Sequence, residues 1–198
     1  MLSGAVLMMI GTKSVLFGAH CFFIHPWFVA LAWWKLWGFP KDMRLWFAFF
    51  LHDIGYWQKP NMDGPEGETH VELGARIMHR LFDHPVGECR TNFDSYCHQY
   101  QCFSRCWKWH DFCLYHSRYY SKKAGKPFSR LAVADKLSFA LTPKWLYMPM
   151  VGLTGELKEY MSETKYKDGR ENDTPSEWYD RVATWVGKWA KEQANAKT

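Results

Sequence analysis

The sequence has no uninterrupted apolar run of the length that a membrane span requires, which is about 20 residues. Its most apolar segment, residues 21–39, contains His25, Pro26 and Lys35. The first residues lack the basic segment of a secretory signal, and residues 11–13 interrupt their apolar run. We therefore expect a soluble, cytoplasmic protein without a membrane partner, in which residues 21–39 contribute a core helix.

A strong charge of either sign is also missing. The formal net charge is +5 and is spread along the chain, which suits a phosphate-bearing ligand but does not by itself indicate nucleic-acid binding. Without a secretory signal, disulfides are not expected. The cysteines of residues 89–113 lack the paired CxxC spacing of recognised zinc motifs. A zinc site at Cys97, His98, Cys102 and Cys106 is therefore one reading of this stretch, and small buried thiols are the other.

No segment shows the strict alternation of a half-buried strand, and apolar residues recur with helical period instead. The pattern predicts an all-α fold. We expect helices over residues 26–38, 41–53, 69–82, about 92–121 with one break, 129–141, about 154–165 and from 174 onward. Thr69 and Thr154 are expected N-caps, and the spacing of Thr174 and Glu177 is that of a capping box.

The last of these helices carries one apolar stripe. Its members lie at helical spacing, so we expect them to pack on the body of the protein: Trp178, Val182, Trp185, Val186 and Trp189.

Five helical segments each place one ionisable group on their apolar face. His52, for example, follows Leu45, Ala48 and Phe49 at the offsets that share a helix face. The five groups are His25, His52, His70, His116 and Asp135, and Asp53 comes directly after His52. A single inward histidine usually just bonds a backbone carbonyl. Five together need a common partner, and a divalent metal accepts imidazole nitrogen and carboxylate oxygen at once.

The order and local context of these residues resemble the HD-domain metalloenzyme superfamily. The chain carries the H…HD…H…H…D order, with "LHDIG" at residues 51–55, "HVELGARIM" at 70–78 and "LAVADKL" at 131–137. It has "YHSRYY" where the HD-GYP branch carries a histidine pair and its Gly-Tyr-Pro signature, so a cyclic-di-GMP enzyme is not expected. The resemblance implies a single HD domain over 1–198, with a core at about 20–141, an insert at about 83–106 and a C-terminal helical extension at about 152–195.

The resemblance also implies a dinuclear metal site. One metal would be held by His25, His52, Asp53 and Asp135, and a second by His70 and His116, with Asp53 as the bridging ligand. The metal would be a divalent ion such as Mn, Fe, Co or Mg. His20 lies five residues before His25, which we favour as the ligand because it opens a helix; His20 is then expected beside the ligands.

The implied activity is that of a phosphohydrolase or phosphodiesterase, in which a metal-bridged hydroxide attacks a nucleotide or another small phosphate ester. Asp53, His52 and Arg118 would be its catalytic residues. Arg118, Lys122, Lys59 and Trp57 would bind the substrate, although a solvated helix end also explains cations near 118–126. The leaving group would take its proton from Asp63, Glu66 or Glu68, among which the sequence does not choose.

Two other functions fit the same residues. HD-type di-iron oxygenases, which cleave C–P or C–C bonds, share the six-ligand pattern. A binding module that uses its metals structurally is a third reading, which the complete ligand set disfavours. We expect no sequence-specific nucleic-acid partner, and a homo-oligomer is a further possibility.

Overall fold

Every regular element is a helix in the part of the chain that the structure describes. The structure, a computed structural model, describes residues 8–62, 65–83, 108–168 and 173–196. The helices are α1 (Ile10–Phe17), α2 (His25–Trp37), α3 (Met43–Leu51), the short 3-10 helix η1 (Ile54–Tyr56), α4 (Pro65–Glu68), α5 (Val71–Phe82), α7 (Lys108–Leu114), α8 (Arg118–Lys123), α9 (Arg130–Leu141), α10 (Lys144–Thr154), α11 (Glu156–Asp168) and α12 (Pro175–Ala196). The expected all-α fold is confirmed.

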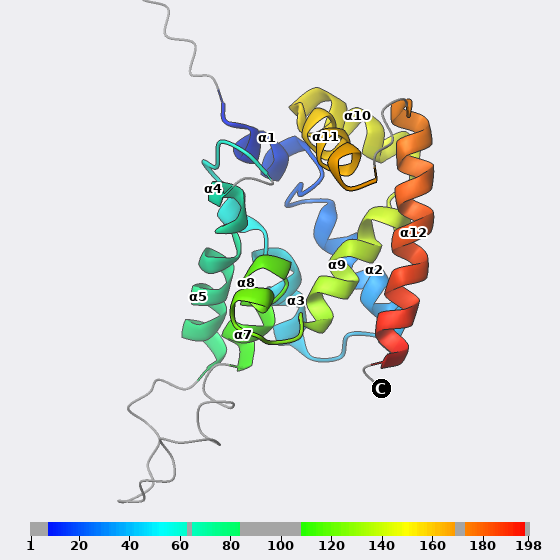
Figure 1. Ribbon diagram of the computed structural model, residues 1–198. Coiled ribbons are helices and arrows are strands. Elements are labelled where there is room, and N and C mark those ends of the chain that lie inside the picture. The colour runs from blue at the N-terminus through cyan, green and yellow to red at the C-terminus, as the bar shows by residue number, and fades with distance from the viewer. Residues whose placement is uncertain (1–7, 63–64, 84–107, 169–172, 197–198) are drawn as a thin grey trace, which may run out of the picture.

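Helix α9 lies at the centre of the fold, where it packs against both α2 and α12, while α5 packs against α7 and α3 (Figure 1). One hydrophobic core joins these helices. Val29 of α2, Phe49 of α3, Met78 of α5 and Leu131 of α9 are each fully buried in it. Because the segments that carry the six candidate ligands share this core, their relative positions are fixed by tight packing.

Side-chain caps define several helix starts. Asp42 accepts a hydrogen bond from the backbone N–H of Arg44 at 2.9 Å and begins α3. The expected capping box is confirmed, because the N–H of Thr174 donates to Glu177 Oε2 at 2.9 Å and the N–H of Glu177 donates to Thr174 Oγ1 at 3.3 Å. Residues 92–107 of the expected helix at 92–121, and residues 84–106 of the expected insert, lie outside the described residues. In the described part, a break at residues 115–117 separates α7 from α8.

Two expected caps are wrong. Thr69 is not the N-cap of α5, whose first residue follows His70 without a side-chain cap. Thr69 instead directly follows the short helix α4, and the Thr69 hydroxyl donates to the carbonyl of Glu66 at 2.8 Å. Thr154 ends α10 rather than capping α11, and its hydroxyl donates to Glu156 Oε2 at 2.5 Å.

Four helices were not expected from the sequence: α1, the 3-10 helix η1, α4 and α10. Helix α10 even contains Pro149, which removes one intrahelical hydrogen bond and argues against a helix from sequence alone. The stripe on α12 is only partly covered, since Trp178 is 4% exposed but Trp185 is 54% exposed. Among the described residues, no helix combines the length and apolar character needed to cross a membrane. The suggested zinc ligands at 97–106 lie outside the described residues.

Candidate metal centre

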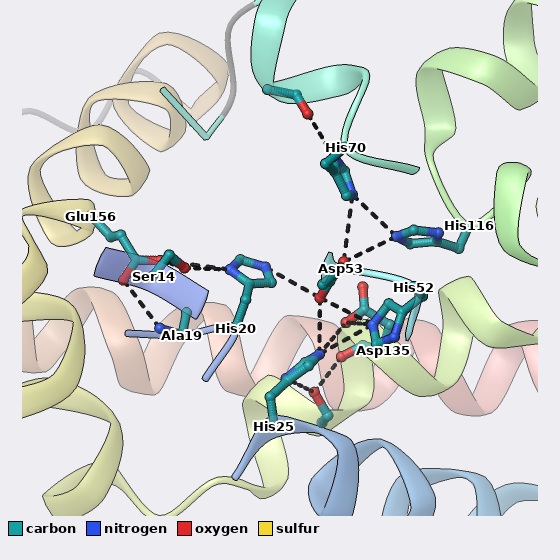
Figure 2. Close-up of polar contacts among 12 residues, drawn as sticks. Ser14, Ala19, His20, His25, His52, Asp53, His70, His116, Asp135 and Glu156 are labelled. Atoms are coloured by element: carbon teal, nitrogen blue, oxygen red, sulfur yellow. Dashed lines mark hydrogen bonds and ion pairs between the residues drawn. The ribbon is translucent and has the colours of Figure 1, made fainter. Parts of the chain in front are cut away.

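The six residues singled out by the sequence meet in one buried cluster (Figure 2). They come from five segments of the fold: the first residue of α2, the end of α3, the start of α5, the turn between α7 and α8, and the middle of α9. The residues are His25, His52, Asp53, His70, His116 and Asp135. Asp135 is partly buried and the other five are buried, His52 almost completely at 1% exposed.

The first ligand group contains two histidines and both carboxylates. His25 Nε2 lies 3.2 Å from Asp53 Oδ2 and 3.1 Å from Asp135 Oδ1. His52 Nε2 lies 3.0 Å from Asp53 Oδ2 and 3.6 Å from Asp135 Oδ1. The two Nε2 atoms are 3.3 Å apart. Their donor atoms therefore converge on one point, as ligands of a single ion do.

The second ligand group shares Asp53 with the first but uses the other carboxylate oxygen. His70 Nε2 is 3.5 Å from Asp53 Oδ1, and His116 Nε2 is 3.3 Å from the same oxygen. The two imidazole nitrogens are 3.2 Å apart. Asp53 thus presents Oδ2 to one group and Oδ1 to the other.

Each of the four histidines is oriented through its second ring nitrogen. The Nδ1 atoms of His52, His70 and His116 lie 3.0, 2.6 and 2.6 Å from backbone carbonyls, which can only accept a hydrogen bond. His25 Nδ1 faces Ser138 Oγ at 3.5 Å, and that hydroxyl donates its proton to the carbonyl of Asp135. All four Nδ1 atoms are therefore protonated, and each Nε2 is the nitrogen available to a metal.

Two glycines explain why the backbone can bring these residues together. A Cβ on Gly55 would lie 1.9 Å from the carbonyl oxygen of His70, and one on Gly74 would lie 2.4 Å from that of Leu51. Only glycine permits this approach between the end of α3 and the start of α5. The glycines of "LHDIG" and "HVELG" thus have a packing role, and Tyr56 stacks on the His70 ring at 3.8 Å between centroids.

The cluster fits a cation on chemical grounds. Asp53 Oδ2 is buried without a hydrogen-bond partner, which is costly for a carboxylate oxygen unless a positive charge lies beside it. Imidazole nitrogens and carboxylate oxygens are donors that divalent transition metals accept. The buried His/Asp cluster could therefore hold a metal ion.

In the first ligand group, the pKa shifts also favour a bound cation. Burial alone would lower the pKa of His52, but the carboxylates of Asp53 and Asp135 outweigh it and raise the pKa to about 10. Burial alone would raise the pKa of both carboxyls, but the surrounding histidines hold the pKa of each well below its ordinary value. The site therefore attracts positive charge, which a metal would supply in place of protons.

A second polar network, which the sequence did not reveal, adjoins the cluster through His20 (Figure 2). His20 belongs to neither ligand group. Its Nε2 lies 3.8 Å from Asp53 Oδ2, while its Nδ1 lies 2.9 Å from Ser14 Oγ and 3.6 Å from Glu156 Oε1. Ser14 donates its one proton to Glu156 Oε1 at 2.6 Å, so its oxygen accepts from His20 Nδ1. His20 is thus beside the ligands, as expected.

Glu156 anchors this network and is completely buried. Its carboxylate also accepts from the N–H of Ala19 at 3.1 Å, from the Tyr160 hydroxyl at 3.0 Å and from the hydroxyl of Thr154. Gly18 leaves room for it, because a Cβ there would lie 1.9 Å from Glu156 Oε2. An acidic residue in the first turn of a helix is common, so no sequence signal marks Glu156 as unusual.

A cavity of about 530 Å³ opens beside the cluster. One side of it is formed by His20 and by five of the six candidate ligands, all except His52. Helices α9, α10, α11 and α12 contribute aromatic residues to the rest of the lining: Phe139, Tyr147, Tyr160, Trp178 and Trp185. The volume lies in the range of pockets that hold small molecules.

Only one of the four residues expected to bind substrate lines this cavity. Arg118 does so and is exposed. Lys122 and Trp57 are exposed but are not among the lining residues, and Lys59 donates to Thr69 Oγ1 at 2.5 Å.

Of the three candidate proton donors, Glu68 is the one that the structure places in the cavity lining. Glu68 lines the cavity and accepts from Ser117 Oγ at 2.8 Å. Glu66 accepts from the side-chain amide of Asn61, away from the cavity, and residue 63 lies outside the described residues.

Comparison of the chain with models of known protein families, with curated proteins and with solved structures gives no match. The resemblance to the HD superfamily therefore depends on the sequence motifs, with which the geometry of the cluster is compatible.

Proposed function

We propose that the protein is a metal-dependent phosphohydrolase or phosphodiesterase of the HD superfamily that hydrolyses a nucleotide. One observation carries this proposal: Asp53 directs one carboxylate oxygen to His25 and His52 and the other to His70 and His116. A carboxylate shared in this way suits two divalent cations, because it supplies the anion that both need. Mn, Fe, Co and Mg are the candidate metals.

Four residues of the chain would have distinct roles in the proposed hydrolysis. When bound, the cations would supply Lewis acidity, lowering the pKa of water and polarising a phosphoryl oxygen. Asp53 and His52 would hold them in place. Arg118, which follows His116 by two residues and lines the cavity, would bind the phosphoryl oxygens through charge-assisted hydrogen bonds. Glu68 would hold the proton that the leaving group requires.

A second candidate is a di-iron oxygenase that cleaves a C–P or C–C bond. It is supported by the composition of the ligand groups, which contain only imidazole nitrogen and carboxylate oxygen. Iron accepts both donors, so the same cluster suits redox chemistry.

The proposal is tested by incubating purified protein, loaded separately with Mn, Co, Fe or Mg, with a panel of nucleoside mono- and triphosphates and cyclic nucleotides. Released phosphate, nucleotide and nucleoside are all measured. We expect hydrolysis of at least one nucleotide, and its loss in the Asp53→Ala variant. The Asp180→Ala variant is the matched control, since Asp180 is exposed, pairs with Lys144 and belongs neither to the ligand groups nor to the cavity lining. Absence of hydrolysis with every metal would contradict the proposal.

A further inference from the structure

Many of the residues that line the cavity besides the candidate ligands are aromatic, and several of them come from one face of α12, which forms an aromatic wall. Trp178, Val182, Trp185 and Val186 are spaced by four, three and one residues, which places them on a single helix face. All four line the cavity. They belong to the stripe that was expected to pack on the body of the protein. In the structure, this part of the stripe lines the cavity beside the candidate ligands.

Helix α9 connects this wall to the ligands. It carries Asp135 of the ligand cluster and, one turn later on the same face, Phe139. Phe139 packs edge-on against Trp178 of α12, with ring centroids 5.9 Å apart. The ligand cluster and the aromatic lining therefore adjoin each other along α9.

Trp185 is the member of this wall with surface left to cover. Its side chain is 54% exposed, whereas Trp178 and Val186 are already buried. The Trp185 indole lies nearly parallel to that of Trp189, with an interplanar angle of 15° and centroids 6.1 Å apart. This contact orients the ring without hiding it, so a flat face is available to a ligand in the cavity.

The polar residues of the same wall suit a base more than an alkyl chain. Glu163 and Arg181 line the cavity beside the aromatic rings. The Arg181 guanidinium is held by Asp173, with Nε 2.8 Å from Oδ2. A carboxylate acceptor and a guanidinium donor next to aromatic faces are the groups that bind the edge and the face of a heteroaromatic ring.

We infer that α12 forms a base-binding wall, and that the occupant of the cavity is a nucleotide whose base stacks on Trp185 while its phosphate lies at the ligand cluster. This inference rests on the proposed nucleotide-hydrolysing function and adds to it the helix face that binds the base. Stacking of a base on an aromatic side chain is worth enough to change affinity by about tenfold or more.

The test uses analogues that the protein cannot turn over. The probes are the 5′-methylenephosphonate analogues of AMP, GMP, CMP and UMP, in which carbon replaces the ester oxygen. Their base-free counterpart is the methylenephosphonate of 1-O-methylribose, and hexylphosphonate represents an aliphatic ligand. Binding to the Mn-loaded protein is measured by titration calorimetry under nitrogen, so that an oxygenase reaction cannot consume them.

We expect at least one nucleoside analogue to bind about tenfold more tightly than the base-free compound. Trp185→Ala should remove about tenfold of that affinity and leave the base-free compound within about twofold, while Trp185→Phe should restore most of the loss. Trp145→Ala is the matched control, because Trp145 is 76% exposed and is not part of the cavity wall. It should bind all probes as the wild type does.

Three results overturn the inference while leaving the phosphate-ester function in place. The first is equal affinity for the nucleoside analogues and the base-free compound. The second is an affinity of hexylphosphonate, relative to the base-free compound, as high as that of the nucleoside analogues. The third is unchanged nucleoside affinity in Trp185→Ala. If no phosphonate binds to fully metal-loaded protein, both the base wall and the proposed function are contradicted.

Discussion

Replacing Glu156 tests whether the buried network beside the metal centre is correctly described. In Glu156→Gln, the amide oxygen can occupy the position of Oε2 and continue to accept from Ala19 N–H and Thr154. The amide nitrogen then faces Ser14 and Tyr160, whose hydroxyls can rotate to accept. The substitution therefore keeps the shape of the network and removes its charge.

The expected loss of folding stability follows from the hydrogen bonds that Glu156 accepts. Hydrogen bonds to a charged group contribute about 1.5–3 kcal/mol, against about 1 kcal/mol for neutral ones, so the loss of charge should destabilise the fold by about 2 kcal/mol. For a domain of this size that lowers Tm by about 4–8 °C. Glu156→Ala leaves a buried N–H and several hydroxyls without an acceptor, and should cost about 3–5 kcal/mol.

The assay is thermal unfolding followed by circular dichroism, with the metal-loaded protein and with chelator. Burial alone would raise the pKa of Glu156, but His20, Ser14 and Thr154 outweigh it and lower the pKa below the ordinary 4.5. The charged form is thus favoured by folding. The difference between wild type and Glu156→Gln should be complete near neutral pH and should shrink as the pH falls below about 4.5. Two results would show that the charge of Glu156 does not stabilise the network as described. One is equal destabilisation by Glu156→Gln and Glu156→Ala, and the other is a difference between wild type and Glu156→Gln that persists unchanged at low pH.

Three further outcomes are expected. His70→Ala should lower metal content mainly in the second group, leaving the His25–His52–Asp135 group filled; complete loss, measured by elemental analysis, would argue against two separable groups. Arg118→Ala should reduce kcat/KM for a phosphate ester by about 10- to 100-fold with metal content unchanged, because one charge-assisted contact worth about 1.5–3 kcal/mol is lost. The Mn-loaded protein should form product as fast under nitrogen as in air, since a hydrolase needs its metals only as Lewis acids; strict dependence on iron and oxygen would favour the oxygenase.

The ligand cluster could be predicted from the sequence because its members disturb a strong pattern. Each of His25, His52, His70, His116 and Asp135 sits at a position where helical periodicity calls for an apolar residue. Burial of an ionisable group is costly enough that such an exception needs a reason. The all-α class followed from the same periodicity.

The Glu156 network and the aromatic wall could not be predicted in the same way. Glu156 lies at the start of a helix, where a carboxylate is ordinary. Two of its partners, Ser14 and Ala19, are distant from it in the chain. The stripe of α12 has the composition of a core face. Whether Trp185 is covered depends on how far α9, α10 and α11 extend beneath it, which is a property of tertiary packing.

The two wrong caps have a common cause. Thr69 and Thr154 each precede a helix, as a capping threonine would. In the structure Thr69 directly follows α4 and Thr154 is the last residue of α10, so each belongs to the end of the preceding helix. Local sequence does not distinguish the end of one helix from the start of the next when only one or two residues separate them.

The metal content of the Asp53→Ala variant shows whether the buried His/Asp cluster is a metal centre. Wild-type protein, the variant and the Asp180→Ala control are each incubated with excess Mn or Co, freed of unbound metal by gel filtration and analysed by mass spectrometry for metal per chain. We expect up to two ions per chain in the wild type and the control, and almost none in Asp53→Ala. The circular dichroism spectrum of Asp53→Ala should remain that of the helical wild type. Full occupancy in Asp53→Ala, or no bound metal in the wild type, would contradict the assignment of the cluster as a metal centre.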